Sequence, residues 1–328
     1  MKKKIAIGAI AVSILFALYL WMKPDSLTKK AEKLQENLIS YQLVGSMEVS
    51  TKEDFKNYLI TSLWMKKDDQ EYFKVSMLDK NLNQEQIILK NTEGVYVVTP
   101  ALNQVFKFQG EWPMNSPKPY LLQTMLEIIE GECEISSQGQ GYVINAPANY
   151  PSASTLVTQE IVMTKDLKPI SLKAYNGEGT VELQMDFTEA IYNEPIETSA
   201  FDTPNTNIQT PTSAYTGLIE LPLYPMAVFD SKLTSSTVSS NGKETSHILE
   251  FSGGKEFTVI QKAISKNQEL SVKEIEGELV EGLGLIGYYN GNRLTVVNSQ
   301  METSVYSDTL SVNEMLQVVE SMQVSVMK

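Results

Sequence analysis

Few residues in this chain are of a type, and at a spacing, that catalysis or ligand binding requires. Gly282, Gly284 and Gly287 match the letters of a dinucleotide-binding loop. Such a loop must lie between a strand and the N-terminus of a helix, where the helix dipole meets the pyrophosphate. The following residues, YYNGNRLTVV, are instead typical of a hairpin that turns at 290–292. We therefore interpret the three glycines as part of a tight turn.

Other candidate motifs are equally incomplete. The segments 26–29 (SLTK) and 240–243 (SNGK) match the Ser-x-x-Lys letters of penicillin-recognising enzymes, but the chain has no Lys-Thr-Gly triplet. It has one cysteine, Cys133, and one histidine, His247. These counts exclude an intramolecular disulfide, a Cys/His zinc cluster and any nucleophilic site that needs a second histidine. We expect no catalytic residue, no metal and no cofactor, and therefore not an enzyme.

Clusters of charge are interpreted as solvated surface. Glu127, Glu130, Glu132 and Glu134 straddle the end of an expected helix and the loop after it, so we predict an exposed rim and not an acid/base or metal site. The chain has 27 Lys+Arg against 40 Asp+Glu, a net charge of −13. Binding to duplex nucleic acid depends on cations that neutralise phosphates, so we expect no nucleic-acid partner.

The N-terminus predicts a location. Residues 5–22 (IAIGAIAVSILFALYLWM) are 18 consecutive uncharged and mainly apolar residues behind three lysines. That length is close to what a helix needs to cross a membrane. The run ends in bulky residues and lacks a small-residue cleavage site, which favours an uncleaved signal anchor over a cleaved signal peptide. We expect a single-pass cell-membrane protein, attached to the cytoplasmic membrane through residues 5–22, with the bulk of the chain extracytoplasmic.

The elements that must position any site are mainly strands. We predict a helix over 26–40 and another over 119–130, and between and after them the apolar period is two. Roughly eleven strands in antiparallel order before residue 190 indicate an α+β unit with one large antiparallel sheet. Residues 190–216 contain three prolines and many Thr and Asn, as linkers do. The predicted domains are 1–25 (membrane anchor), 26–205 (main domain), 206–216 (linker) and 217–328 (small, strand-rich α+β domain closing with a helix over 311–322).

The strands are apolar at half or more of their positions, so the sheet must cover two faces or curve. We predict a curved sheet with the two helices laid over its concave side as a lid, enclosing an apolar cavity. The same residues could instead form an ordinary core between the sheet and the helices. The expected cavity lining is Trp64, Phe73, Val75, Met77, Ile87, Leu89, Tyr96, Val98, Phe106 and Phe108, and the expected lid residues are Leu121, Leu122, Met125 and Leu126.

Four stretches carry a family resemblance: 62–75 (SLWMKKDDQEYFKV), 86–108 (QIILKNTEGVYVVTPALNQVFKF), 119–129 (PYLLQTMLEII) and 161–204. Together they resemble the LolA/LolB-type lipoprotein carrier superfamily over about 26–205. The resemblance implies an open, incomplete β-barrel with a helical lid and an apolar cavity suited to acyl chains. The matched positions are Leu63, Trp64, Lys66, Gly94, Pro100, Gln104, Val105, Leu167, Pro169, Asn193 and Phe201.

Within this superfamily the chain looks most like Gram-positive sporulation and germination relatives of the GerS and YdcC type. That resemblance implies a binding or scaffold protein in sporulation, germination or envelope maintenance. Its partner would be an envelope protein such as a peptidoglycan amidase, or a lipid or acyl chain. The segments 228–233 (VFDSKL) and 309–322 (TLSVNEMLQVVESM) are similar to the C-terminal domain of RseB-like regulators. This alternative implies a membrane anti-sigma factor as the partner.

Overall fold

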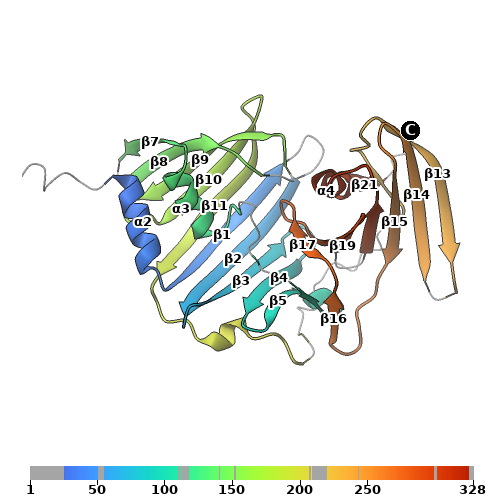
Figure 1. Cartoon of the computed structure of the whole chain (residues 1–328), viewed down its shortest axis with the longest axis horizontal. Coiled ribbons are helices and arrows are strands. Elements are labelled where there is room, and N and C mark those ends of the chain that lie inside the picture. The colour runs from blue at the N-terminus through green and yellow to red at the C-terminus, as the bar shows by residue number, and fades with distance from the viewer. Residues whose placement is uncertain are drawn as a thin grey trace, which may run out of the picture.

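The computed structural model describes residues 26–50, 55–109, 112, 118–139, 141–150, 153–206, 208, 220–242, 244–298 and 301–324. These parts of the chain are mainly strands (Figure 1). The helical segments among them are α2 (Leu27–Asn37), α3 (Leu122–Glu130), α4 (Val312–Glu320) and the 3-10 turns η1 (Pro100–Leu102) and η2 (Thr198–Phe201). The three helices expected from the sequence are present, each shorter than expected by a few residues at one or both ends.

The predicted location as a single-pass membrane protein needs correction. In the portions that the structure describes, no helix is both long and apolar enough to cross a membrane. Their α-helices have 9 to 11 residues, whereas a membrane-spanning helix needs about 20. Residues 5–22, on which the anchor was predicted, lie outside the described residues.

Twelve strands form the larger sheet, and their neighbours are antiparallel except for β16, which is parallel to β6. Its two end strands, β16 and β7, are not paired with each other, so the sheet is open, as expected from the sequence. The strands in spatial order are β16 (Ser271–Ile275), β6 (Gln104–Phe108), β5 (Gly94–Thr99), β4 (Gln84–Asn91), β3 (Gln70–Asp79), β2 (Phe55–Lys67), β1 (Ser40–Ser50), β11 (Val181–Tyr192), β10 (Pro169–Asn176), β9 (Leu156–Thr164), β8 (Gly141–Pro147) and β7 (Glu134–Gln138).

The C-terminal part of the chain forms a second, antiparallel sheet of seven strands, with a two-stranded ribbon beside it. A strand-rich C-terminal region was predicted and is confirmed, but β16 leaves it to join the larger sheet. The exact domain boundaries stay a prediction. The seven strands in order are β13 (Ser231–Ser240), β14 (Thr245–Gly253), β15 (Phe257–Ala263), β20 (Met301–Tyr306), β19 (Arg293–Asn298), β18 (Ile286–Asn290) and β17 (Glu278–Glu281), and the ribbon pairs β12 (Leu223–Pro225) with β21 (Met322–Val324).

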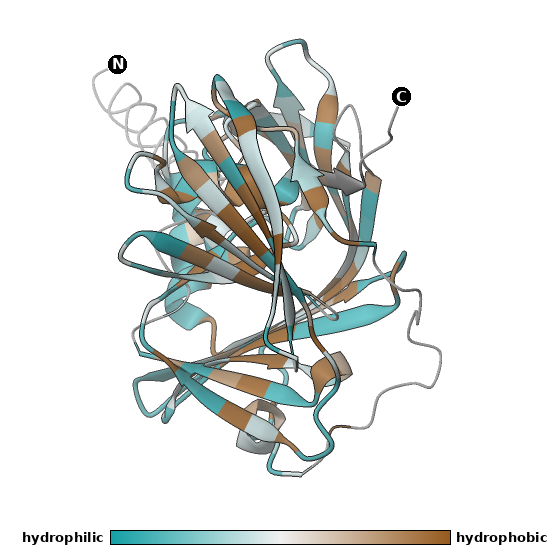
Figure 2. Cartoon of the chain, turned by 90° about the vertical axis from the view of Figure 1, so that its right-hand side faces the viewer, coloured by the Kyte–Doolittle hydropathy of each residue, from teal (hydrophilic) through white to brown (hydrophobic). Residues whose placement is uncertain are grey.

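Apolar and polar residues alternate along many strands (Figure 2), as expected where side chains point to opposite faces in turn. We call the face of the larger sheet that carries Tyr41, Trp64 and Val75 the inner face. Helices α2 and α3 lie over its β1 and β7–β11 side (Figure 1) and share one buried core with it. We call the opposite face, which carries Met65 and Tyr96, the outer face, and it has a separate buried cluster.

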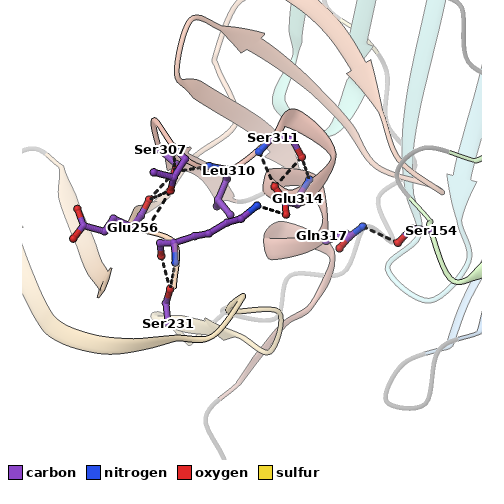
Figure 3. A network of polar contacts seen from close by, with 10 residues as sticks. Ser154, Ser231, Glu256, Ser307, Leu310, Ser311, Glu314 and Gln317 are labelled. Atoms are coloured by element: carbon purple, nitrogen blue, oxygen red, sulfur yellow. Dashed lines mark hydrogen bonds and ion pairs between the residues drawn. The ribbon is translucent and has the colours of Figure 1, made fainter. Parts of the chain in front are cut away.

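Helix α4 is fixed at its N-terminus by polar contacts (Figure 3). The hydroxyl of Ser311 accepts a hydrogen bond from the backbone N–H of Glu314, and the Glu314 side chain accepts one from the backbone N–H of Ser311. This reciprocal capping satisfies backbone donors that the first helical turn leaves open. Lys255 forms an ion pair with the Glu314 carboxylate, and Gln317 reaches the hydroxyl of Ser154 at 3.3 Å. The helix therefore contacts both the smaller sheet and a loop that precedes β9.

Candidate functional site: the inner face and the junction between the sheets

The structure divides the predicted cavity lining between the two faces of the sheet. Six of the ten residues lie in the inner core: Trp64, Phe73, Val75, Met77, Phe106 and Phe108. The other four lie on the outer face, with Leu89, Tyr96 and Val98 in its cluster and Ile87 packed against it. These four residues therefore cannot line the same cavity as the first six, because the sheet itself separates them.

Strand register gives the reason for this correction. Val75 pairs with Ile88, Ile88 with Val97, and Val97 with Phe106. Directly paired residues point to the same face, so Ile88 and Val97 are the inner-face residues of β4 and β5. The segments Ile87–Leu89 and Val95–Val98 are apolar at every position, so alternation alone could not show which residues face inward.

Aromatic rings and helix side chains fill the inner face. Tyr41 stacks on Trp64 at 5.6 Å between ring centroids, and Trp112 meets the ring of Phe73 edge-on at 5.5 Å. The Tyr41 hydroxyl donates a hydrogen bond of 2.6 Å to Gln123 of α3. Burial is the main cause that raises the pKa of this hydroxyl far above its ordinary value. The predicted lid residues Leu121, Leu122, Met125 and Leu126 are all buried in the same core.

Residues of the smaller sheet also pack against the inner face, on its β3–β6 side. Leu279, Ile286 and Val297 belong to the same buried core as the inner face. Along this seam, two cavities lined by described residues have volumes of about 10 and about 90 Å³. Sites that hold drug-sized ligands measure roughly 300–1,000 Å³. These two cavities are therefore too small for a long acyl chain.

A buried carboxylate joins the smaller sheet to residues between β6 and α3. Glu281 of β17 lies 3.4 Å from the ammonium of Lys118, and their side chains are only 3% and 7% exposed. The Glu281 carboxylate also accepts hydrogen bonds from the Tyr120 hydroxyl at 2.8 Å and from the indole N–H of Trp112. Burial and the nearby carboxylate raise the pKa of Tyr120. A buried charge with this many donors is satisfied within the fold and is not left open to a substrate.

Of the three glycines interpreted as part of a tight turn, Gly282 and Gly284 lie in a turn at this junction, whereas Gly287 lies in β18. The 282–285 segment links β17 to β18, with the N–H of Gly282 bonded to the carbonyl of Leu285 at 2.8 Å, so the tight turn is confirmed. Gly284 has φ +78°, and a Cβ there would lie 2.4 Å from the ring of Tyr58. The Tyr58 hydroxyl in turn donates to the Gly284 carbonyl at 3.2 Å. Only glycine fits this position.

The same turn faces the end of α4. A Cβ on Gly282 would lie 2.0 Å from an Oε1 atom of Glu320. That oxygen is buried and has no hydrogen-bond partner among the described residues. Burial raises the pKa of Glu320 from 4.5 to about 7, opposed by the charge of Lys56 and by a hydrogen bond from the backbone of Leu283. The junction therefore holds one carboxyl group that titrates near neutral pH.

The remaining candidate residues are not assembled into a reactive site. His247 lies on β14 opposite Val238 and Gln261, and Cys133 donates to the carbonyl of Ile129 at 3.7 Å. Burial raises the pKa of Cys133, which disfavours the reactive thiolate. Within the described residues, no three His, Cys, Asp or Glu side chains are placed to hold a metal ion.

Comparison with known proteins finds a sequence relative that matches over nearly the whole chain. No family model matches the chain. The chain is 29% identical to the sporulation protein YdcC of Bacillus subtilis (strain 168), and the match covers 96% of this chain and 95% of that protein. The sequence resemblance to a YdcC-type sporulation protein is therefore confirmed, and it extends across the larger sheet and the C-terminal region alike.

Solved structures are more distant. The complex of MucA and MucB from Pseudomonas aeruginosa matches with a TM-score of 0.33 and 13% identity, covering 90% of this chain and 98% of that one. An outer membrane lipoprotein-sorting protein domain from Vibrio parahaemolyticus matches with a TM-score of 0.30 and 11% identity, covering 53% and 95%. Both scores lie below 0.5, so neither likeness supports a function for this chain.

Proposed function

We propose that this chain is a sporulation protein that acts by binding a protein partner of the cell envelope, and that it is not an enzyme and not an acyl-chain carrier. The observation that carries the choice of a protein partner is the filled inner face. Aromatic rings, α3 and the smaller sheet occupy the space in which a carrier would hold its cargo. The full-length likeness to YdcC supports the context of sporulation.

The absence of enzymatic function is part of the same proposal. Two residues of types that often serve in catalytic or binding sites, Glu281 and Gly284, have packing roles here. Glu281 is paired with Lys118 and bonded by two further donors, and Gly284 supports a tight contact with Tyr58. Groups committed to packing in this way are not available for catalysis without a loss of stability.

The test uses a tagged full-length chain, expressed from its own locus in the source organism during sporulation. We expect cross-linking followed by mass spectrometry to recover one envelope protein in stoichiometric yield, and deletion of the gene to lower the count of heat-resistant or germinating spores. A tag-only strain is the control. An amidase or an anti-sigma factor among the products would decide between the two partner classes that the sequence predicts. A deletion strain with normal spores and no enriched protein would contradict the proposal.

A further inference from the structure

Strand β7 is one of the two end strands of the larger sheet, and no strand of the described chain pairs with its outer edge. It ends the twelve-strand order, and all five of its side chains are exposed. We propose that β7 is the docking edge for the partner, which adds an extended segment of alternating basic and apolar residues as a further strand. This inference rests on the proposed function because it names the surface through which a protein partner would bind.

The hairpin between β7 and β8 shows which backbone groups are free. Gln138 pairs with Gly141, so a two-residue loop connects the strands, and Gly139 has the positive φ (57°) that such loops use. The pair that flanks a two-residue loop is hydrogen-bonded, and bonded and non-bonded pairs then alternate along the ladder. Ile135 and Ser137 are therefore non-bonded to β8, and their N–H and C=O groups point outward from the sheet.

At the opposite end of the same sheet, a strand from a distant part of the chain pairs with the edge. There, β16 adds in parallel to β6 in an unbroken register from Ser271 to Ile275. Its three central side chains are exposed, so its pairing to the sheet depends largely on the backbone. An edge of this sheet thus accepts a short solvated strand within the chain itself. Strand β7 offers the equivalent edge with no strand of the described chain upon it.

The other free edges are less suitable. Strand β13 has a register irregularity between Leu233 and Ser235, and bulges of this kind are a means by which proteins protect edges from pairing. Strand β17 has only four residues, and one of them, Glu281, is held in the buried ion pair. The register of β7 with β8 is regular over all five of its residues. Strand β7 also lacks proline and lysine, which commonly block edges.

The side chains around β7 indicate the chemistry of the incoming segment. Glu130, Glu132 and Glu134 are exposed, and none of them forms an ion pair within the described chain. On the alternate face, Ile135 pairs with the buried Ile144 yet is itself 41% exposed. Side chains of an added strand alternate between these two faces. Basic residues would lie beside Glu134 and apolar residues beside Ile135.

The test measures binding of a fluorescent peptide, acetyl-Lys-Val-Lys-Val-Lys-Val-Lys-amide, to the full chain at low salt. A second peptide carries N-methyl groups on alternate residues, so its charge is retained while one edge of its backbone is blocked. We expect the N-methylated peptide to bind at least about tenfold more weakly, as the loss of two or more backbone hydrogen bonds predicts. We expect a similar loss for Ser137→Pro and unchanged binding for Ser137→Ala, which keeps the backbone N–H.

Equal binding of the two peptides to the wild-type chain would overturn the proposal, because charge alone would then explain the binding. No binding of the parent peptide would overturn it as well. If Ser137→Pro does not fold, the peptide comparison on wild-type protein decides. Cross-linking separates this inference from the proposed function: a partner recovered equally with wild type and Ser137→Pro would refute only the β7 assignment, whereas no partner with wild type would refute the proposed function.

Discussion

Replacement of Glu320 by glutamine should stabilise the protein at alkaline pH. Burial raises the pKa of this carboxyl from 4.5 to about 7, so the folded chain holds its proton more tightly than the unfolded chain does. The stability that the protonated Glu320 contributes is fully present below about pH 4.5 and is lost as the pH rises through 7. At 1.36 kcal/mol per pKa unit, the ionised Glu320 costs about 3 kcal/mol above pH 8. Glutamine has nearly the same shape and carries no charge to bury.

The assay is urea unfolding of the wild type and of Glu320→Gln between pH 4.5 and pH 8.5. The free energies of unfolding should coincide near pH 4.5 and diverge as the pH rises, with the variant more stable by up to about 3 kcal/mol. Glu314→Gln is a control from the same helix, and we expect it to change stability in the opposite direction. The hydrogen bond with Lys255 lowers the pKa of Glu314, so the ionised carboxylate stabilises the fold. This control should be less stable than wild type throughout this pH range, because the lowered pKa of Glu314 lies below pH 4.5 and the wild-type carboxylate stays ionised. A stability difference for Glu320→Gln that does not change with pH would refute the reasoning.

Two further predictions concern the junction between the sheets. Glu281→Leu should destabilise the protein by roughly 3–5 kcal/mol because it removes the carboxylate from a buried ion pair with Lys118. The double variant with Lys118→Met should recover much of that loss in urea unfolding, and simple additivity would contradict the coupling. Gly284→Ala should cost more than about 1 kcal/mol because of its positive φ and its contact with the Tyr58 ring. The control Gly177→Ala, in open space, should stay within about 0.5 kcal/mol in the same assay, and equal effects of the two alanines would show that the contact is unimportant.

Local patterns predicted much of the fold because their physical causes are local. Helix α4 begins behind Ser311, where the capping residue stands directly before the apolar spacing. The eleven strands expected before residue 190 correspond to β1–β11. Strand β13 has no such local signal, because its sequence, SKLTSSTVSS, is solvated on both faces and so has no alternation of apolar and polar residues.

The site depended on contacts that local patterns do not contain. Glu281 and Tyr120 are hydrogen-bonded across 161 residues of sequence, and no property of either segment predicts the pairing. The same holds for β16, which crosses back to β6 of the larger sheet. Whether an apolar face is open or filled depends on what packs against it, so the sequence alone could not choose between a cavity and a core.

Native mass spectrometry of the purified full-length chain, followed by lipid extraction, tests the central claim most directly. The filled inner face and cavities of about 10 and about 90 Å³ predict a protein mass equal to that of the polypeptide, with no stoichiometric acyl lipid released on denaturation. A lipid that co-purifies at one molecule per chain, and that is lost when Phe106 is replaced by aspartate without unfolding, would contradict the claim that this protein binds a protein partner on a filled sheet.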